Sequence, residues 1–305
     1  MVARASIQPE LRIAMANFRF GNIINNSSER WDRMMRWEQT VSALRAWQPH
    51  IVLCQGLSAI APGGLRAHLW STANTLDMIP LLGPPGPGSI TGSHPAILVA
   101  VSAGLVILDA DPVWLPSAGS QPAWCEALVQ VPGWARPMRA YSIDLPSDSS
   151  VEQRSQADRL ATRVAELGEL AVAGGNWNSY GRADVISPSG LNTVSLPLRP
   201  LRMRYDPQNR TLTPNYDVHD VLTSIGMEEA VALLHSRKGD LEDLTPDGTV
   251  WRTDRIYMTK DIAGAATRYI SQDIGDSDHQ AQMLILDGLT AARAFPPGPG
   301  RQPAM

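Results

Sequence analysis

Short apolar runs that end in a polar residue recur along this chain. The run at 11–16 is followed by Asn17, and the run at 51–54 is followed by Gln55. Similar runs lie at 96–101, 105–108, 124–131, 139–145, 170–173, 255–258 and 283–287. Runs of this length bounded by turn residues are typical of buried strands. Between them lie segments with apolar residues three and four positions apart, which predict helices, so the chain is predicted to be an α/β protein.

Capping signals set the expected helix boundaries. Ser27 or Ser28 is predicted to start a helix that ends near residue 47, because the residue before Pro49 is driven out of the helical region. A second helix is predicted after the capping box Ser150-x-x-Gln153. A third is predicted over 218–225 with Asp217 as its cap, and an ambiguous helix lies somewhere in 59–77. Residues 81–92 and 180–215 are predicted to be loops.

Length and composition limit the number of domains and the class of partner. The 305 residues allow one large α/β domain or two small ones, and no composition shift marks a second. We expect a short extension at 1–10, one domain at 11–291 and a disordered Pro/Gly-rich tail at 292–305. The formal net charge of −4 argues against binding nucleic acid by overall charge, although a local basic groove remains compatible with it.

The sequence is expected to belong to a cytoplasmic protein with no membrane segment. Its first residues lack the apolar core of a signal peptide. The longest apolar stretch, 95–108, is too short to span a bilayer and is interrupted at 102–104. Cys54 and Cys125 lie in apolar runs, where a free cysteine behaves as a small buried hydrophobe. No cysteine spacing of a zinc or redox site is present.

Polar side chains at strand ends are the candidate functional residues, because strand ends in layered α/β folds meet at one rim where sites are usually built. They are Asn17, Gln55, Asp144, Asn176, Asn178, Asp254, Asp278 and His279. Taken one at a time, each has a simpler interpretation as a turn residue or an ordinary histidine. Their order along the chain and their flanking residues are more specific.

Five segments in this order resemble motifs of the endonuclease/exonuclease/phosphatase superfamily, the deoxyribonuclease-I-like phosphoesterases. They are LRIAMANFRFG, RWEQTVSALRAWQPHIVLCQGL (similar to D-I-V-x-L-Q-E at its end), AVAGGNWNS (G-G-D-x-N), WRTDRIYMT (R-x-D-R-I-Y) and DSDHQAQMLIL (S-D-H). The resemblance covers residues 11–287. It implies a four-layer α-β-β-α sandwich of two mixed β-sheets flanked by helices, and hydrolysis of a phosphoester assisted by Mg²⁺ or Mn²⁺.

The resemblance also implies roles for individual residues. His279 matches the histidine that contacts the scissile phosphate, and Asp278 matches the acidic residue beside it near the metal. Asp254 matches the aspartate that orients the site histidine or positions the site. Asn178 matches the phosphate-contacting asparagine, and Asn17 matches the asparagine near the metal.

Three matched positions depart from the family pattern. The metal-binding Glu is replaced by Gly56, and Gln55 before it is expected to point to the opposite face unless a bulge intervenes. The Asp that orients the attacking water is replaced by Asn176, whose amide cannot accept a proton. A family histidine is replaced by Asp144, which is interpreted either as a carboxylate for a displaced metal or, preferably, as a solvated strand-end residue.

These departures leave three functions open. The first is an active, metal-dependent phosphoesterase or nuclease with a remodelled site. The second is a pseudoenzyme that binds a phosphorylated ligand, nucleic acid or a protein partner, and the departures favour impaired or lost hydrolysis. The third is a purely structural protein. Arg199, Arg202, Arg204 and Arg210 form either a cationic rim for a polyanion or a solvated basic loop. The sequence selects neither the oligomeric state nor one substrate among DNA, RNA, inositol phosphate and lipid head groups.

Overall fold

The computed structural model describes most of the chain. The described residues are 9–18, 27–57, 64–85, 93–110, 122–168, 170–184, 194, 196, 199–238, 253–273 and 279–294. Asp278 and most of the predicted tail lie outside these ranges.

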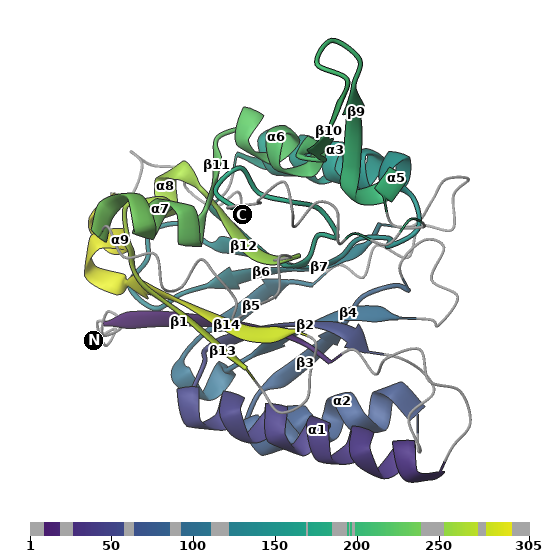
Figure 1. Ribbon diagram of the computed structural model, residues 1–305. Helices are drawn as coiled ribbons and strands as arrows, with labels where there is room; N and C mark the ends of the chain where they lie inside the picture. The colour runs from purple at the N-terminus through teal and green to yellow at the C-terminus, as the bar shows by residue number, and fades with distance from the viewer. Residues whose placement is uncertain are drawn as a thin grey trace.

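Two six-stranded mixed β-sheets form the centre of the molecule (Figure 1). The first sheet has the strand order β13 (Ala266–Asp273), β14 (Gln280–Asp287), β1 (Glu10–Asn17), β2 (Ile51–Leu57), β4 (His94–Val99) and β3 (Ile79–Leu82). The second has the order β11 (Met227–Glu229), β12 (Asp254–Thr259), β8 (Leu170–Asn176), β7 (Met138–Asp144), β6 (Trp124–Gln130) and β5 (Val106–Asp109). Only β1 with β2 and β7 with β8 pair in parallel among these neighbours.

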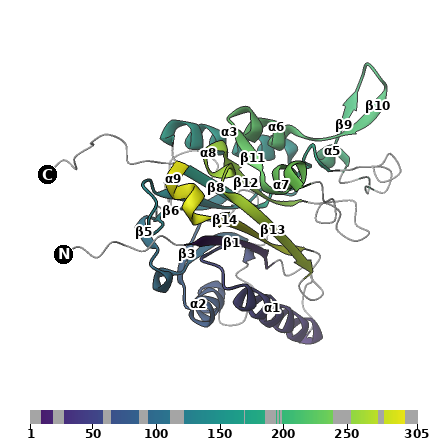
Figure 2. The same ribbon diagram turned by 90° about the vertical axis from the view of Figure 1, so that its left-hand side faces the viewer.

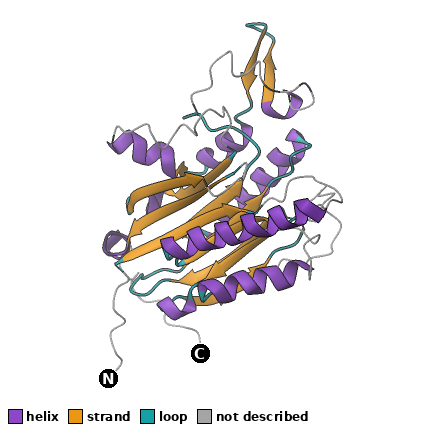
Figure 3. Ribbon diagram, turned by 60° about the horizontal axis from the view of Figure 1, so that its bottom comes forward, coloured by secondary structure: helices purple, strands orange, loops and turns teal. Residues whose placement is uncertain are grey.

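Helices cover the outer faces of both sheets, which gives the four layers expected from the sequence. Helices α1 (Ser27–Trp47) and α2 (Gly64–Leu76) lie across the first sheet (Figure 3). Helices α3 (Ser150–Leu167) and α6 (Asp217–Ser224) cover the second. The largest apolar cluster lies between the two sheets, where strands buried on both faces need apolar side chains at nearly every position. Among the described residues, no helix combines the length and the apolar character needed to cross a bilayer.

Shorter elements complete the fold. Helices α7 (Ala230–Lys238), α8 (Lys260–Ala263) and α9 (Gly288–Ala294) lie at the same end of the molecule as β11 and the start of β1 (Figure 2). The turn η1 (Val101–Ala103) ends at Gly104 with a φ of 85°, as a tight connection between β4 and β5 requires. Helix α9 extends past residue 292, where the sequence predicted the tail to begin.

The prediction of a structureless loop at 180–215 is wrong. This segment contains the short helix α5 (Arg199–Arg202) and a hairpin of β9 (Met203–Asp206) and β10 (Thr211–Pro214) that belongs to neither large sheet. The hairpin projects from the body of the molecule in two perpendicular views (Figures 1 and 2).

Two predicted helix caps are also wrong by one or two residues. The hydroxyl of Ser149, not Ser150, accepts the N–H of Glu152 at 3.2 Å. Gln153 is buried and donates to the carbonyl of Pro146 at 2.8 Å instead. Helix α6 already includes Asp217, whose N–H is accepted by the side chain of Asn215 at 3.1 Å.

Candidate functional site

Strand pairing aligns three of the candidate side chains in one row of the second sheet. Asp144 at the end of β7 is the register partner of Asn176 at the end of β8, and Asn176 is the partner of Asp254 at the start of β12. In the first sheet, Asn17 at the end of β1 pairs with Gln55 in β2. The N–H of Gly56 donates to the carboxylate of Asp144 at 3.4 Å, which joins the two rows across the sheets.

His279 immediately precedes β14 and lies between the two sheets' rows of polar residues. Its Nδ1 contacts Oδ2 of Asp254, and the side-chain nitrogen of Asn17 lies 3.4 Å from the same Nδ1. Because a carboxylate accepts hydrogen bonds, the Asp254 contact favours the tautomer of His279 that carries its proton on Nδ1. The other carboxylate oxygen of Asp254, Oδ1, is buried and has no hydrogen-bond partner among the described residues.

A β-bulge in β2 decides where Gln55 and Gly56 point. The register between β2 and β4 shifts between Cys54 and Leu57, and Gly56 has a φ of 69°. That left-handed conformation favours glycine, and Gly is the usual residue in bulges of this kind. The Gln55 side chain is buried between the sheets, where its amide donates to Ser142 Oγ at 2.9 Å and to the Gly174 carbonyl at 3.3 Å. Gln55 therefore does not replace the missing carboxylate at the rim.

Asp144 is not the solvated strand-end residue that the sequence favoured. Its Oδ2 accepts the hydroxyl of Ser93 at 2.6 Å in addition to the N–H of Gly56, and the residue is half-buried. The carboxylate from β7 thus reaches the first sheet beside Gly56, the position of the family's glutamate.

In the turn after β8, the side-chain amides of Asn176 and Asn178 are hydrogen-bonded within the protein. Asn176 is buried and accepts the N–H of Asn178 at 3.2 Å, and Asn178 has a φ of 49°, which asparagine tolerates better than most residues. The Asn178 amide donates to the carbonyl of Leu145 at 2.7 Å, and its oxygen accepts Nη2 of Arg202 at 3.4 Å. Both ends of the Asn178 side chain are therefore used within the protein.

Two glycines precede this turn because other groups approach their backbone closely. A Cβ on Gly175 would lie 1.9 Å from the carbonyl oxygen of Ile143. A Cβ on Gly174 would lie 2.7 Å from Leu53 on the facing sheet. Glycine at both positions lets β8 approach β7 and β2 at the site.

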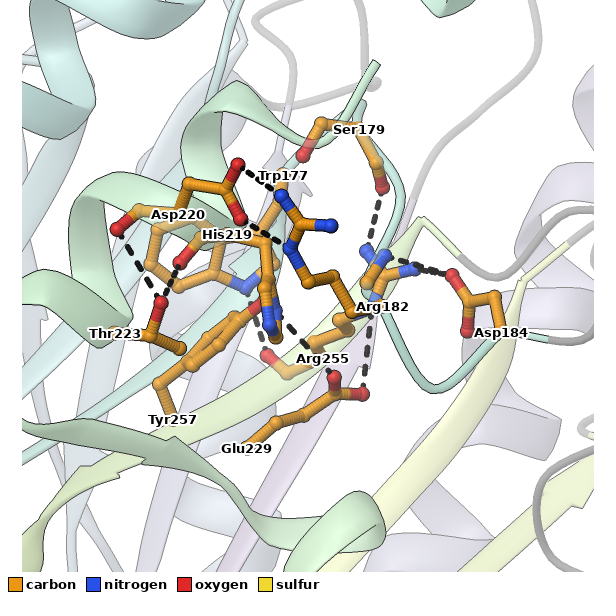
Figure 4. A network of polar contacts seen from close by, with 11 residues as sticks. Trp177, Ser179, Arg182, Asp184, His219, Asp220, Thr223, Glu229, Arg255 and Tyr257 are labelled. Carbon is orange, nitrogen blue, oxygen red and sulfur yellow. Dashed lines mark hydrogen bonds and ion pairs between the residues drawn. The ribbon is translucent and has the colours of Figure 1, made fainter. Parts of the chain in front are cut away.

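A buried charged network supports the segment that follows Asn178 (Figure 4). Arg255, next to Asp254 on β12, is fully buried and contacts the carboxylates of Asp184 and Glu229 and the carbonyl of Ser179. The indole N–H of Trp177 donates to the Arg255 carbonyl at 2.9 Å. Burial alone lowers the pKa of Arg255, but the two carboxylates outweigh it, so the pKa lies above its ordinary value and the guanidinium is always charged.

The network continues to helix α6 at the molecular surface. Arg182 makes two hydrogen bonds of 2.7 Å to the carboxylate of Asp220, and both side chains are exposed to water. His219 Nδ1 lies 2.9 Å from the hydroxyl of Tyr257. Burial lowers the pKa of His219, and the nearby Glu229 opposes that shift.

Comparisons with known proteins were made at the levels of sequence and structure. No family sequence profile and no curated protein sequence matches this chain. Many solved structures do. An endonuclease/exonuclease/phosphatase from Bacteroides vulgatus has a TM-score of 0.60 and 15% identity, over 92% of this chain and 99% of that one. The chain has the endonuclease/exonuclease/phosphatase fold.

Two further structures of this fold are similar over nearly their whole lengths. An AP endonuclease from Archaeoglobus fulgidus has a TM-score of 0.58 and 16% identity, with coverage of 91% of this chain and 99% of that chain. TDP2 from D. rerio, in complex with a single-stranded DNA product, has a TM-score of 0.57 and 14% identity, with coverage of 91% and 99%.

Among the described residues of this endonuclease/exonuclease/phosphatase fold, the set of carboxylates is incomplete for a divalent metal ion. Among the described residues, no group of three His, Cys, Asp or Glu side chains is arranged to hold one. Mg²⁺ is usually anchored by one or two carboxylates, yet Gly56 supplies none and Asp144 accepts two protein hydrogen bonds. Asp278, the other acidic residue expected near a metal, lies outside the described residues.

The four arginines of the 199–210 segment differ in their contacts. Arg202 reaches Asn178 in the site and lies over the ring of Tyr180, with 6.0 Å from Cζ to the centroid. Arg204 pairs with Asp217, and Arg199 donates to the carbonyl of Val194 at 3.2 Å. Arg210 is exposed in the hairpin turn. Among the contacts that the structure describes, Arg202 is the one arginine of the four that touches a candidate site residue. The cationic-rim interpretation is therefore supported at one position.

Proposed function

We propose that this protein binds a phosphate ester at the end of its sandwich and that its metal-assisted hydrolysis is impaired. The observation that carries the proposal is the combination of the His279–Asp254 pair with a rim in which Gly56 and Asn176 supply no carboxylate. A phosphate needs hydrogen-bond donors and positive charge. A rim that has a histidine and lacks these two carboxylates is suited to such an anion. Ordinary hydrolysis also needs a group that positions or deprotonates water. Such a group typically raises the reaction rate by ~10²–10⁴-fold.

In this proposal His279 contacts a phosphate oxygen through Nε2, and Asp254 orients the ring and stabilises its protonated form. The side chain of Asn17 lies beside the same ring. Since the amide of Asn178 is used within the protein, the phosphate contact expected there passes to the neighbouring Arg202. A guanidinium carries five N–H donors in a planar fork, so one arginine can bond both Asn178 and a phosphate.

A second candidate function is an active phosphoesterase, with Mg²⁺ or Mn²⁺, on the same residues. It is favoured by the buried Oδ1 of Asp254, since an unpartnered carboxylate oxygen beside a histidine is a suitable acceptor for a proton or a cation. It also requires Asp278 to take the metal role that the sequence resemblance gives it.

Binding and turnover separate the two candidates. Calorimetry with thymidine 5′-phosphate is expected to give binding to the wild type that is lost in His279→Ala and weakened in Arg202→Ala. With bis(4-nitrophenyl) phosphate and Mg²⁺ or Mn²⁺, release of nitrophenolate by the wild type is expected to equal the His279→Ala background. Absence of thymidine 5′-phosphate binding would refute the proposal, and metal-dependent turnover above that background would establish the second candidate.

A restored variant tests whether the missing carboxylates limit hydrolysis. Asn176→Asp with Gly56→Glu is expected to gain metal-dependent turnover if the scaffold is otherwise competent. Because Gly56 has a left-handed backbone, the melting temperature of the double variant is compared with that of Asn176→Asp alone. Equal turnover by wild type and restored variant would contradict the impairment.

A further inference from the structure

The projecting β9–β10 hairpin exposes an aromatic ring on a segment rich in arginine. Tyr205 and Leu212 are direct cross-strand partners and therefore lie on the same face of the hairpin. Their side chains are 62% and 41% exposed. The pair stabilises the hairpin, but a two-stranded sheet has no second layer to cover it, so one side of the tyrosine ring remains open to solvent.

The base of the hairpin is fixed to the candidate site. Arg202 immediately precedes β9 and donates to Asn178. The buried Asn215, just after β10, donates its N–H to the carbonyl of Arg202 at 2.9 Å and its amide to the carbonyl of Leu201 at 3.2 Å. The carbonyl of Asn215 accepts the N–H of Tyr180 at 3.3 Å. The hairpin thus leaves the body of the molecule at the turn that carries Asn178.

The charge of the segment 199–214 is strongly positive in an otherwise acidic chain. It contains four arginines and one aspartate, a formal charge of +3 against −4 for the whole chain. The one carboxylate, Asp206, is held within the turn by three hydrogen bonds from Gln208 and Asn209, and these bonds lower its pKa. The hairpin segment therefore combines an exposed aromatic ring with arginines, of which Arg204 is paired with Asp217 and Arg210 is exposed in the turn.

We propose that this hairpin binds a single-stranded nucleic acid that extends from a phosphate held in the candidate site. Tyr205 stacks on a base, while Arg210 and Arg202 contact backbone phosphates on either side of it. Aromatic rings beside arginines are the usual means of binding single strands without sequence preference. An acidic protein would also satisfy the charge, but the open ring and the direct continuity with a phosphate site favour nucleic acid. The inference rests on the proposed function for the phosphate at the site.

Fluorescence anisotropy with a labelled twelve-nucleotide oligothymidylate, in EDTA and separately in Mg²⁺, tests this inference. Tyr205→Leu keeps the apolar pair with Leu212 but removes the ring, and is expected to bind about 5- to 100-fold more weakly, the loss of one base stack. Tyr205→Phe keeps the ring and is expected to bind like the wild type. Arg210→Ala is expected to reduce the slope of log K against log salt by about 0.7, whereas the exposed Arg268→Ala on β13 leaves it unchanged.

The outcomes separate the hairpin from the site. Equal affinity of Tyr205→Leu and Tyr205→Phe for the oligonucleotide, or no oligonucleotide binding by the wild type, overturns the hairpin proposal. If thymidine 5′-phosphate still binds in that case, the proposed function survives. Poly-glutamate that binds with the same dependence on Tyr205 assigns the hairpin to an acidic protein and also overturns the proposal.

Discussion

Asp144 on β7 accepts the backbone N–H of Gly56 on β2 at 3.4 Å, across the gap between the two sheets. The resemblance expected a glutamate at position 56 and a histidine at position 144. Instead, the carboxylate comes from the opposite sheet and is also held by Ser93. The rim therefore retains a negative charge near this position, but on a side chain that already accepts two hydrogen bonds.

Gly56 is predicted to be required by its backbone conformation. Its φ of 69° disfavours every residue with a Cβ, so Gly56→Ala is expected to lower the free energy of unfolding by about 1–2 kcal/mol. Gly56→Asn is expected to lower it by less, because asparagine tolerates this region. Urea denaturation provides the measurement. The control is Gly264→Ala, where φ is −59° and no atom lies within 4 Å of the added Cβ. Equal stability of the two alanine variants would show that the bulge relaxes.

Asp144 is predicted to weaken phosphate binding by charge repulsion. Asp144→Asn keeps an oxygen for Ser93 and Gly56 but removes the negative charge, and is expected to tighten binding of thymidine 5′-phosphate by about 3- to 10-fold at low salt. The matched control is Asp109→Asn on the edge strand β5, which is expected to leave binding unchanged. Calorimetry at two salt concentrations measures both. Weaker binding of Asp144→Asn in the presence of Mg²⁺ would instead show that Asp144 holds a cation.

Local patterns predicted most of the framework because buried strands and helix faces depend on nearby residues. The strand before Asn17 follows from its apolar run, whereas the turn Gly174–Asn178 follows from its resemblance to the G-G-D-x-N motif. The bulge at Gly56 does not follow from the sequence, because it depends on how β2 pairs with β4 far along the chain. The hairpin at 203–214 was missed because its strands are short, polar and stabilised through Asn215. The role of Arg255 does not follow from the segment WRTDRIYMT, because its two carboxylate partners come from distant segments.

The buried Arg255 is predicted to be essential for stability. Arg255→Met removes the cation and leaves Asp184 and Glu229 buried without it, and losses from breaking a buried ion pair are about 3–5 kcal/mol. Arg182→Met breaks an exposed pair with Asp220, where less than about 1 kcal/mol is expected. Urea denaturation of the two variants measures the loss in free energy of unfolding for the same substitution at a buried and at an exposed arginine. Similar losses would mean that the buried carboxylates become protonated or rehydrated at little cost.

His50 is predicted to make the stability of the first sheet depend on pH. Its Nδ1 accepts the N–H of Arg12 at 3.0 Å, which requires the neutral ring. Burial, with a smaller contribution from the Arg12 charge, lowers the pKa of His50 from 6.5 to about 4. Because the unfolded chain takes up this proton at higher pH than the folded protein, the contribution to stability is complete above about pH 6.5 and is lost as the pH falls towards 4.

The variant His50→Asn isolates that contribution from the titration of acidic groups in the same range. Its side-chain oxygen can accept the N–H of Arg12 but does not titrate. The urea midpoint of the wild type is therefore expected to fall more steeply between pH 7 and pH 4.5 than that of His50→Asn, and the difference between the two curves should develop below pH 6.5. Parallel curves would mean that the ring is protonated in the folded protein as readily as in the unfolded chain, and that Arg12 has moved away from Nδ1.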